Sequence, residues 1–543
     1  MSLNCRSLTG DIKREAVQRK RAVRWGAVPE SVSAASLPVR YPFPEKRRMI
    51  HMRESGILLP VFSLPSPHGI GCFSKEAYRW VDFLVRAGQK YWQILPLGPT
   101  SYGDSPYQSF STYAGNPYFI DLEELVKAKF LTRAEVNACD MGDNERDIDY
   151  GKLYKNRMPL LKKAYKRSKK HPDEEFMAFR KKNGWWLEDY GLFMAVKDIF
   201  GGESWDQWAE DIRYRWDNAI WYYKTNYEDE ISFYAWLQYL FFKQWLKLKA
   251  YANEKGVRII GDIPIYVAYD SADVWAHPDM FQLDGERRPA AVAGCPPDGF
   301  SADGQLWGNP LYRWDYHKKT DYEWWMKRIA YCYDLYDVVR IDHFRGFDEY
   351  YSIPYGDLTA EFGHWEKGPG YDIFRTMKAK LGKKEVIAED LGFLTDSVMR
   401  LVKKTGYPGM KILQFAFDSR EESDYLPHNY TANSVVYTGT HDNDTVLGWL
   451  DSLNRHDKAF AKRYLAIRSQ KDIQWEFIRA AMASVSDTCI IPMQDYLGLG
   501  AEARINIPST LGLNWKWRML PGAFDEELAH RIRRMTKLYG RLG

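Results

Sequence analysis

The chain contains the stretch Val338-Val339-Arg340-Ile341-Asp342-His343-Phe344-Arg345-Gly346-Phe347, in which a short apolar run gives way to polar residues. A strand of a parallel sheet that is buried on both faces has such a short apolar run. In a (β/α)8 barrel, residues just past the carboxyl end of a strand face the active site. The stretch therefore predicts that Arg340, Asp342 and His343 lie at a catalytic mouth, with Asp342 able to act as a nucleophile.

Working outward, similar short runs recur along the chain and alternate with segments of helical period. Counting the one that opens the quoted stretch, eight strands are predicted: 91–97, 118–122, 257–263, 337–341, 385–388, 410–417, 434–438 and 488–493. Helices are predicted at 74–87, 233–254, 322–335, 371–380, 395–404 and 474–484. This alternation indicates parallel βαβ units. We expect an α/β fold, a (β/α)8 TIM barrel with loop insertions. A doubly wound open sheet is the alternative, but the chain has no GxGxxG or GxxxxGK phosphate loop.

The chain also divides by length and composition. The segment 123–256 is too long for one βα loop and is rich in Lys, Glu, Trp and Tyr at helical spacing. We interpret it as a mostly helical insertion between strands 2 and 3 of a catalytic barrel that spans residues 53–543. Its eight Trp residues are interpreted as core rather than as sugar platforms.

Residues 1–52 form a separate basic extension. Residues 1–53 carry twelve Lys and Arg against four Asp and Glu, so the net charge of +4 belongs to this end and not to the body. We expect the extension to be a disordered arm or the result of an upstream start, because it lacks the apolar core of a secretory signal. The body shows no bias toward nucleic acid, and no run of the chain approaches the length of a membrane span.

Cysteine usage bears on the compartment. The six cysteines are scattered singly, without CxxC or paired spacing. Such usage is typical of a reducing compartment and argues against a disulfide framework or a zinc ribbon. We expect a cytoplasmic protein.

Acidic residues end several predicted strands. Asp262 lies near the end of the third strand, Glu389 follows the fifth and Asp442 the seventh, in addition to Asp342 after the fourth. One such Asp could be a helix cap, but four strand ends of this kind are hard to explain by capping. Carboxylates that converge on one barrel mouth suit glycoside chemistry, which needs a carboxylate on one face of the sugar and a proton donor on the other.

Roles can be assigned to these residues from their surroundings. Asp342 is the candidate nucleophile, kept ionised by Arg340, and Glu389 on the next strand is the candidate acid/base. Asp442 could bind sugar hydroxyls and help to distort the ring. His343 and His441 could donate hydrogen bonds to hydroxyls, although either one alone suits a structural role as well. A metal site is not expected, since neither HExxH nor a calcium loop is present.

Several motifs, in order, resemble those of the 4-α-glucanotransferases, the amylomaltases or disproportionating enzymes of glycoside hydrolase family 77 in the α-amylase superfamily. The motifs lie at 95–109, 116–118, 261–266, 274–279, 305–312, 340–347, 387–392, 440–445, 503–509 and 514–515. The resemblance runs from about Gly56 to the C-terminus. It implies a (β/α)8 barrel in which Asp342 is the nucleophile, Glu389 the general acid/base and Asp442 the transition-state stabiliser. It further implies these substrate-binding residues: Arg340, His343, His441, Asp262, Tyr102, Asp104, Ser105, Tyr107, Trp307 and, with a looser match, Asn506.

The resemblance also implies the reaction. A segment of an α-1,4-glucan would pass from a malto-oligosaccharide, amylose or starch donor to glucose or another glucan as acceptor, without a cofactor. Segments 99–118 and 285–312, rich in Tyr and Pro, could exclude water and so favour transfer. Two alternatives stay open: an α-amylase-like retaining hydrolase, and a non-catalytic glucan-binding protein, which the presence of all three carboxylates disfavours.

Overall fold

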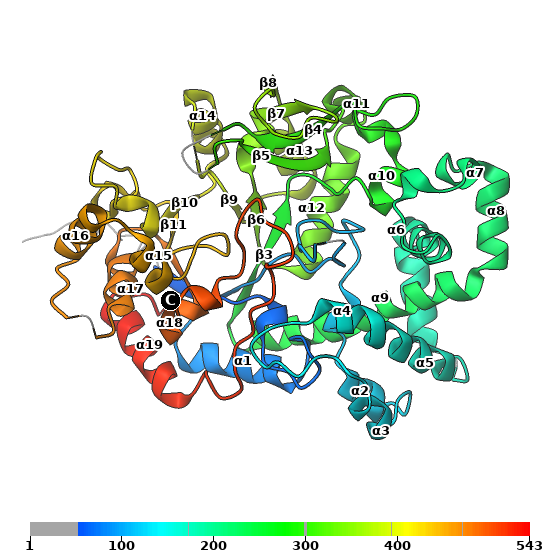
Figure 1. Ribbon diagram of the computed structural model, residues 1–543, viewed down its shortest axis with the longest axis horizontal. Helices are drawn as coiled ribbons and strands as arrows, with labels where there is room; N and C mark the ends of the chain where they lie inside the picture. Colours follow the sequence, from blue (N-terminus) through cyan, green and yellow to red (C-terminus); the bar gives the residue numbers. More distant parts are fainter. Residues whose placement is uncertain are drawn as a thin grey trace, which may run out of the picture. The chain divides into compact units, whose positions relative to one another are not determined.

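The computed structural model describes residues 53–542 except 102, 172, 298–300, 393 and 470. An eight-stranded parallel sheet forms its centre (Figure 1). The strands, in their order across the sheet, are β10 (Gly409–Ile412), β11 (Ser434–Tyr437), β12 (Thr488–Pro492), β1 (Glu54–Leu58), β2 (Tyr91–Gln93), β3 (Arg258–Pro264), β6 (Val338–Asp342) and β9 (Val386–Ala388). This is the (β/α)8 barrel that the sequence predicted.

The sheet closes between its two outermost strands, β9 and β10. The amide of Ala388 donates to the carbonyl of Pro408 at 3.0 Å, and the Asp390 carboxylate accepts from the amide of Met410 at 2.7 Å. A closed sheet has an interior, and every strand contributes to it. The interior cluster consists of Leu58, Tyr91, Ile260, Val338, Ile387, Met410, Ile412, Val435, Tyr437 and Ile490. It is therefore a packed core and not a pore.

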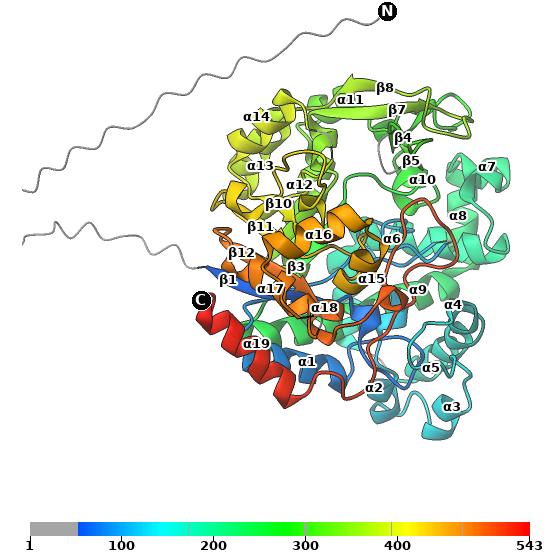
Figure 2. The same ribbon diagram turned by 60° about the vertical axis from the view of Figure 1, so that its left-hand side comes forward.

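Helices surround this sheet (Figure 1). Those outside the insertion are α1 (Lys75–Arg86), α10 (Ala272–Ala276), α11 (Trp314–Lys319), α12 (Glu323–Leu335), α13 (Tyr371–Leu381), α14 (Asp396–Thr405), α15 (Val446–Ser452), α16 (Arg455–Tyr464), α17 (Gln474–Ala483), α18 (Met493–Leu497) and α19 (Glu526–Leu538). Figures 1 and 2 both show α19 beside α1, and β12 pairs with β1 in the sheet. The end of the chain thus packs against its first βα unit.

The segment between β2 and β3 is mostly helical, as predicted. Its helices are α2 (Leu122–Lys127), α3 (Arg133–Asn137), α4 (Tyr150–Lys152), α5 (Met158–Ser168), α6 (Glu174–Ile199), α7 (Glu210–Arg213), α8 (Asp217–Asn226) and α9 (Glu228–Glu254). Of its eight Trp residues five are buried, which agrees with their interpretation as core. The other three are largely exposed: Trp185, Trp216 and Trp221.

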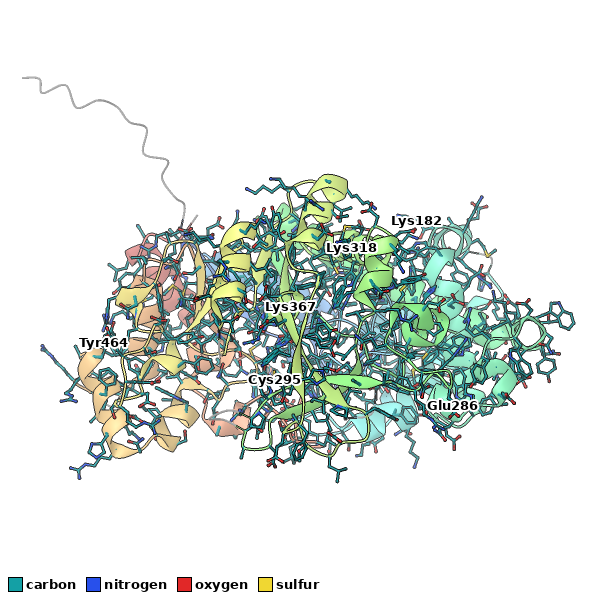
Figure 3. The ribbon with its side chains drawn as sticks, turned by 90° about the horizontal axis from the view of Figure 1, so that it is seen from above. Lys182, Glu286, Cys295, Lys318, Lys367 and Tyr464 are labelled. Atoms are coloured by element: carbon teal, nitrogen blue, oxygen red, sulfur yellow. The ribbon has the colours of Figure 1, made fainter. Side chains whose placement is uncertain are left out.

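A second, antiparallel sheet of four strands stands over the carboxyl ends of β3 and β6. Its order is β5 (Gln305–Pro310), β4 (Ala291–Cys295), β7 (Glu349–Pro354) and β8 (His364–Lys367). Figure 3, seen from above, shows it in front of the barrel, with Cys295 of β4 and Lys367 of β8 labelled. Loop insertions were predicted here from the sequence, but a sheet was not. Within the described part of the chain, no helix combines the length and apolarity needed to cross a bilayer.

One predicted strand was wrong. Residues 118–122 form a 3-10 turn, Pro117–Phe119, followed by α2. Asn116 and Asp121 explain the difference, because their side chains accept hydrogen bonds from the amides of Tyr118 and Glu123 and cap these two turns. The first strand of the barrel, β1, was not predicted, because it has few apolar residues and contains a glycine. A Cβ at Gly56 would lie 2.5 Å from Tyr91, so only glycine lets β1 and β2 approach. All six predicted helices were confirmed, while several strands end earlier than predicted. Residues 1–52 lie outside the described part of the chain.

Candidate active site

The polar residues at the strand ends point into the barrel because side chains alternate along a strand. Ile260, Val338 and Ile387 belong to the interior cluster, and the residues two positions further on are Asp262, Arg340 and Glu389. A period of two residues places each of these on the inner face, and Asp342 follows Arg340 on the same face. In the register of the sheet, Asp262 lies directly opposite Arg340. The strand pattern alone therefore brings three carboxylates and one guanidinium to the mouth.

Arg340 joins two of these carboxylates. Its Nη1 donates to both carboxylate oxygens of Asp262, at 2.8 and 2.6 Å, and its Nη2 lies 2.9 Å from Oδ1 of Asp342. Burial alone would lower the pKa of Arg340, but the charges of Asp262 and Asp342 raise it well above its usual range. The Asp262 side chain is fully buried, whereas 29% of the Asp342 side chain is exposed. Arg340 therefore keeps a fixed positive charge against a carboxylate that a ligand can reach.

Asp262 is held from two further sides. The hydroxyl of Tyr107 donates to its Oδ2 at 2.7 Å. Its neighbour Gly261 packs against the ring of Tyr336, where a Cβ would come within 2.1 Å of the ring carbons. This contact explains the glycine of the Gly-Asp motif, because any side chain there would push β3 away from Tyr336, the residue that follows α12. Asp262 thus serves to orient Arg340 and is not itself open to a ligand.

Glu389 accepts two hydrogen bonds from the backbone. Its Oε2 accepts from the amide of His343 at 2.7 Å and its Oε1 from the amide of Leu391 at 2.8 Å. His343 adopts a left-handed backbone with φ of 52°, which costs energy for a non-glycine residue. Burial, and then the charge of Asp342, raise the pKa of Glu389 to about 7. A carboxyl group with this pKa can hold a proton near neutral pH and also give it up.

The pKa of Asp442 is shifted in the opposite direction, below its usual value. Its Oδ2 lies 3.2 Å from Nε2 of His441, and its Oδ1 accepts from Nδ2 of Asn506 at 2.6 Å. Burial would raise its pKa, but His441 and Asn506 outweigh burial and lower the pKa to about 2. Arg504 holds the same segment by donating to the carbonyl of Asp442 at 2.7 Å and to that of Asn506 at 2.8 Å. Asp442 is therefore a permanent negative charge, and 41% of its side chain is exposed.

Rings line the remaining sides of the mouth. Tyr107 stacks on His441, with centroids 5.2 Å apart and planes inclined by 16°, and the edge of the His343 ring meets Trp307 at 4.8 Å. Burial lowers the pKa of His343 to about 4, so its imidazole is neutral at physiological pH. Among the described residues, Nε2 of His343 has no hydrogen-bond partner. A buried nitrogen of this kind is available to a ligand hydroxyl.

The predicted site residues are therefore largely brought together. Asp262, Arg340, Asp342, Glu389, Asp442, both histidines, Tyr107, Trp307 and Asn506 are linked by the contacts above. Asp104 and Ser105 lie on the loop of Tyr107, where Oγ of Ser105 accepts from the Tyr107 amide at 3.3 Å. Tyr102 lies outside the described residues.

Sequence reasoning missed three supporting residues. One is Arg504. The second is Trp515, whose ring lies 6.1 Å from that of His441. The third is Asp495, which accepts hydrogen bonds from Thr438 Oγ1 at 2.5 Å and from the Val446 amide at 2.7 Å, at the two ends of the segment that carries Asp442. Arg504 and Trp515 lie within the matched motifs and could have been found there, whereas no pattern marks Asp495.

A metal ion does not fit the donor set at this mouth. Arg340, His441, Asn506 and backbone amides hold both carboxylate oxygens of Asp262, Asp442 and Glu389 and Oδ1 of Asp342. In the described ranges, no group of three or more His, Cys, Asp or Glu side chains is arranged to bind a metal ion.

Comparison with known proteins assigns the chain to a family. The family model described as 4-alpha-glucanotransferase, that of glycoside hydrolase family 77, matches residues 59–523. A 4-alpha-glucanotransferase of Clostridium butyricum is 51% identical over 483 residues, which cover 89% of this chain and 99% of that protein. One from Thermus thermophilus is 48% identical over 501 residues, covering 90% and 99%.

A solved structure agrees with this assignment. The amylomaltase of Streptococcus agalactiae in complex with acarbose is 43% identical, covers 90% of this chain and 99% of that one, and superposes with a TM-score of 0.88. The match extends over the barrel, the helical insertion and the strand ends described above. The chain therefore belongs to the 4-α-glucanotransferase family, glycoside hydrolase family 77.

Proposed function

We propose that Asp342, Glu389 and Asp442 carry a retaining transfer of α-1,4-glucan segments between malto-oligosaccharides. The observation that carries the proposal is the electrostatic contrast within one mouth. Arg340 keeps Asp342 next to a fixed positive charge, the pKa of Glu389 lies near 7, and that of Asp442 lies near 2. One group that titrates near neutrality beside two anions is the arrangement that retaining glycoside chemistry uses.

In the first half of the reaction, a carboxylate oxygen of Asp342 attacks C1 of the donor glucose unit. Glu389 gives its proton to the glycosidic oxygen as that bond breaks, so the leaving chain departs with a new 4-hydroxyl group. The glucan segment is then held as an ester on Asp342 with inverted configuration. Asp442 stays ionised and faces the positive charge that develops on the ring in the transition state.

In the second half, the 4-hydroxyl of glucose or of another glucan attacks C1 of the ester. Glu389, now ionised, takes the proton of this hydroxyl, and Asp342 leaves as a carboxylate. The second inversion restores the α configuration. His343, through its unpartnered Nε2, and His441 are the groups we assign to the sugar hydroxyls, together with Trp307 as an apolar face.

Segment 99–118 and strand β5 cover the mouth and favour transfer over hydrolysis. The side chain of Gln108 donates to Asn309 Oδ1 at 3.1 Å and to the carbonyl of Trp307 at 3.4 Å. These bonds tie segment 99–118 to the β5 strand across the site. A cover held by these bonds can exclude water from the ester while an acceptor glucan enters and packs on the rings of Tyr107 and Trp307.

The partners we propose are malto-oligosaccharides, amylose or starch as donors and glucose as an acceptor. For the compartment we propose the cytoplasm, because Cys72, Cys332 and Cys489 are buried free thiols whose pKa burial raises.

Incubation with maltotriose tests the proposal. Transfer produces glucose together with maltopentaose and longer chains, which anion-exchange chromatography separates. Maltose and glucose without longer products would indicate a hydrolase, and no products at all would indicate a binding protein. Asp342→Asn should abolish turnover but retain glucan binding; unchanged turnover would rule out Asp342 as the nucleophile.

A further inference from the structure

A pocket outside the catalytic mouth opens between the insertion and the barrel. We call it the α6–α12 pocket, because its walls come mainly from α6, α10 and α12, with contributions from segment 99–118, from the turn Pro278–Met280 and from α11. None of the three catalytic carboxylates lines it. Its aromatic walls are Tyr113, Trp185, Trp186, Tyr316 and Trp324. Figure 1 shows α6, α10 and α12 on the same side of the barrel, and Figure 3 labels Lys182 of α6 and Lys318 of the adjacent α11 there.

Trp185 is the unusual wall of this pocket. It belongs to an aromatic cluster, with the ring of Tyr113 at 4.7 Å and that of Tyr331 at 6.3 Å, both meeting it edge to face. Yet 48% of Trp185 is exposed, whereas its neighbour Trp186 is 5% exposed. An indole fixed by such contacts, with half its surface free, offers a rigid flat platform at low entropic cost. Sugar rings bind to platforms of this kind.

The charged groups at the rim of the pocket compensate one another, while the remaining carboxyl group of the lining, Asp273, is buried and accepts a hydrogen bond from a backbone amide. Asp189 pairs with Arg215 at 2.7 Å, and Glu323 pairs with Lys327 at 2.7 Å. These paired charges leave no excess charge at the rim to attract an ion. It fits a neutral ligand that can exchange hydrogen bonds with these polar groups.

The lining of the pocket includes an unused hydrogen-bonding group. Tyr113 is 6% exposed, and its hydroxyl has no hydrogen-bond partner among the described residues. Nearby, the buried Asp273 accepts from the amide of Thr112 at 2.8 Å. A buried hydroxyl without a partner is costly unless a ligand or water satisfies it. Aromatic walls with polar groups at the rim and the base suit a polyhydroxylated ligand.

We propose that the α6–α12 pocket is a second glucan-binding site, which holds a distant part of a long α-1,4-glucan while the catalytic mouth acts on another part. The choice of ligand rests on the proposed function. The two sites share one segment: Ser111 and Tyr113 line the pocket, and Tyr107 of the same segment donates to Asp262. When one glucan chain reaches both sites, binding at the first site raises the effective concentration of the glucan at the second and so raises the overall affinity. A substrate too short to reach both sites does not gain this affinity.

The test compares long and short glucans with Trp185 variants of the full chain. Trp185→Ala should weaken binding to soluble amylose, measured by affinity electrophoresis in an Asp342→Asn background, by about five- to tenfold. The kcat/KM for maltotriose, measured with Asp342 intact, should stay within twofold of the wild type. Trp185→Phe, which keeps a platform, should recover most of the amylose affinity. Trp221→Ala is the matched control, because Trp221 is 68% exposed and lies outside the pocket.

A second variant guards against a folding defect at Trp185. Ala276 lines the pocket, so Ala276→Trp fills it while leaving the Trp185 platform in place, and it should weaken amylose binding similarly. Amylose affinity equal to the wild type in both Trp185→Ala and Ala276→Trp would overturn the proposal, as would a wild type that amylose does not retard. A wild type that forms no longer products from maltotriose would instead overturn the proposed function, so the two failures are distinguishable.

Discussion

The raised pKa of Glu389 predicts that the stability of the protein depends on pH, and the substitution Glu389→Gln tests this. Burial and the charge of Asp342 raise this pKa from 4.5 to about 7 in the folded protein. A carboxyl group with a raised folded pKa contributes stability below its unfolded pKa and loses that contribution as the pH rises through its folded value. Glu389→Gln removes this dependence. The free energy of unfolding of the variant, relative to the wild type, should therefore rise with pH.

The size of this rise follows from linkage. For pKa values of 4.5 and about 7, the contribution changes by at most about 2.5 kcal/mol between pH 5 and pH 8.5, less where water reaches the carboxyl group. The substitution also has a cost that does not vary with pH. Both oxygens of Glu389 accept backbone hydrogen bonds, and the amide of Gln can replace only one of them, at about 1–3 kcal/mol. Comparing two pH values cancels this cost.

Urea unfolding of wild type and Glu389→Gln at pH 5 and pH 8.5 measures the effect. Glu361→Gln, at an exposed position, is the control for the loss of a carboxyl group as such. A difference between wild type and Glu389→Gln that is equal at the two pH values would refute the reasoning, since the carboxyl group would then not be perturbed by the fold. In activity, Glu389→Gln should lose turnover. The wild-type kcat/KM should fall about tenfold per pH unit above about pH 7, because the protonated acid is then lost.

Three further predictions concern the residues that hold the site. Asn506→Ala removes the 2.6 Å bond to Asp442 and should lower kcat by about 10- to 100-fold, with the fold intact by circular dichroism; an unchanged kcat would contradict this. Arg340→Met leaves Asp262 buried without its partner and should lower the free energy of unfolding by about 3–5 kcal/mol in urea titrations; an unchanged midpoint would show that Asp262 takes up a proton instead. Asp495→Asn loses one of two anchors of the segment 438–446 and should lower kcat more than it raises KM, whereas a change in KM alone would exclude a positioning role.

Much of the barrel and of its mouth could be predicted because the relevant patterns are local. Short runs of Val and Ile with polar residues at their carboxyl ends identified seven of the eight barrel strands and the position of the four acidic residues. The missed strand, β1, has a composition that favours no regular structure and is held in place by β2 and β12. The mistaken strand at 118–122 has strand-like residues, but Asn116 and Asp121 cap turns there. The hydrogen bonds of these side-chain caps therefore outweigh the β propensity of the residues.

By itself, the sequence determined which faces of the strands carry carboxylates, because a period of two residues is a property of the chain. Only the tertiary structure decided how each carboxylate is tuned. Nη1 of Arg340 donates to both oxygens of Asp262 through the register of β3 with β6, and Asp442 is held by Asn506 from a segment 64 residues away. Perturbed pKa values arise from burial and from charges brought together by folding, and neither can be read along a chain. The four-stranded antiparallel sheet and the α6–α12 pocket likewise form only where distant segments of the chain meet.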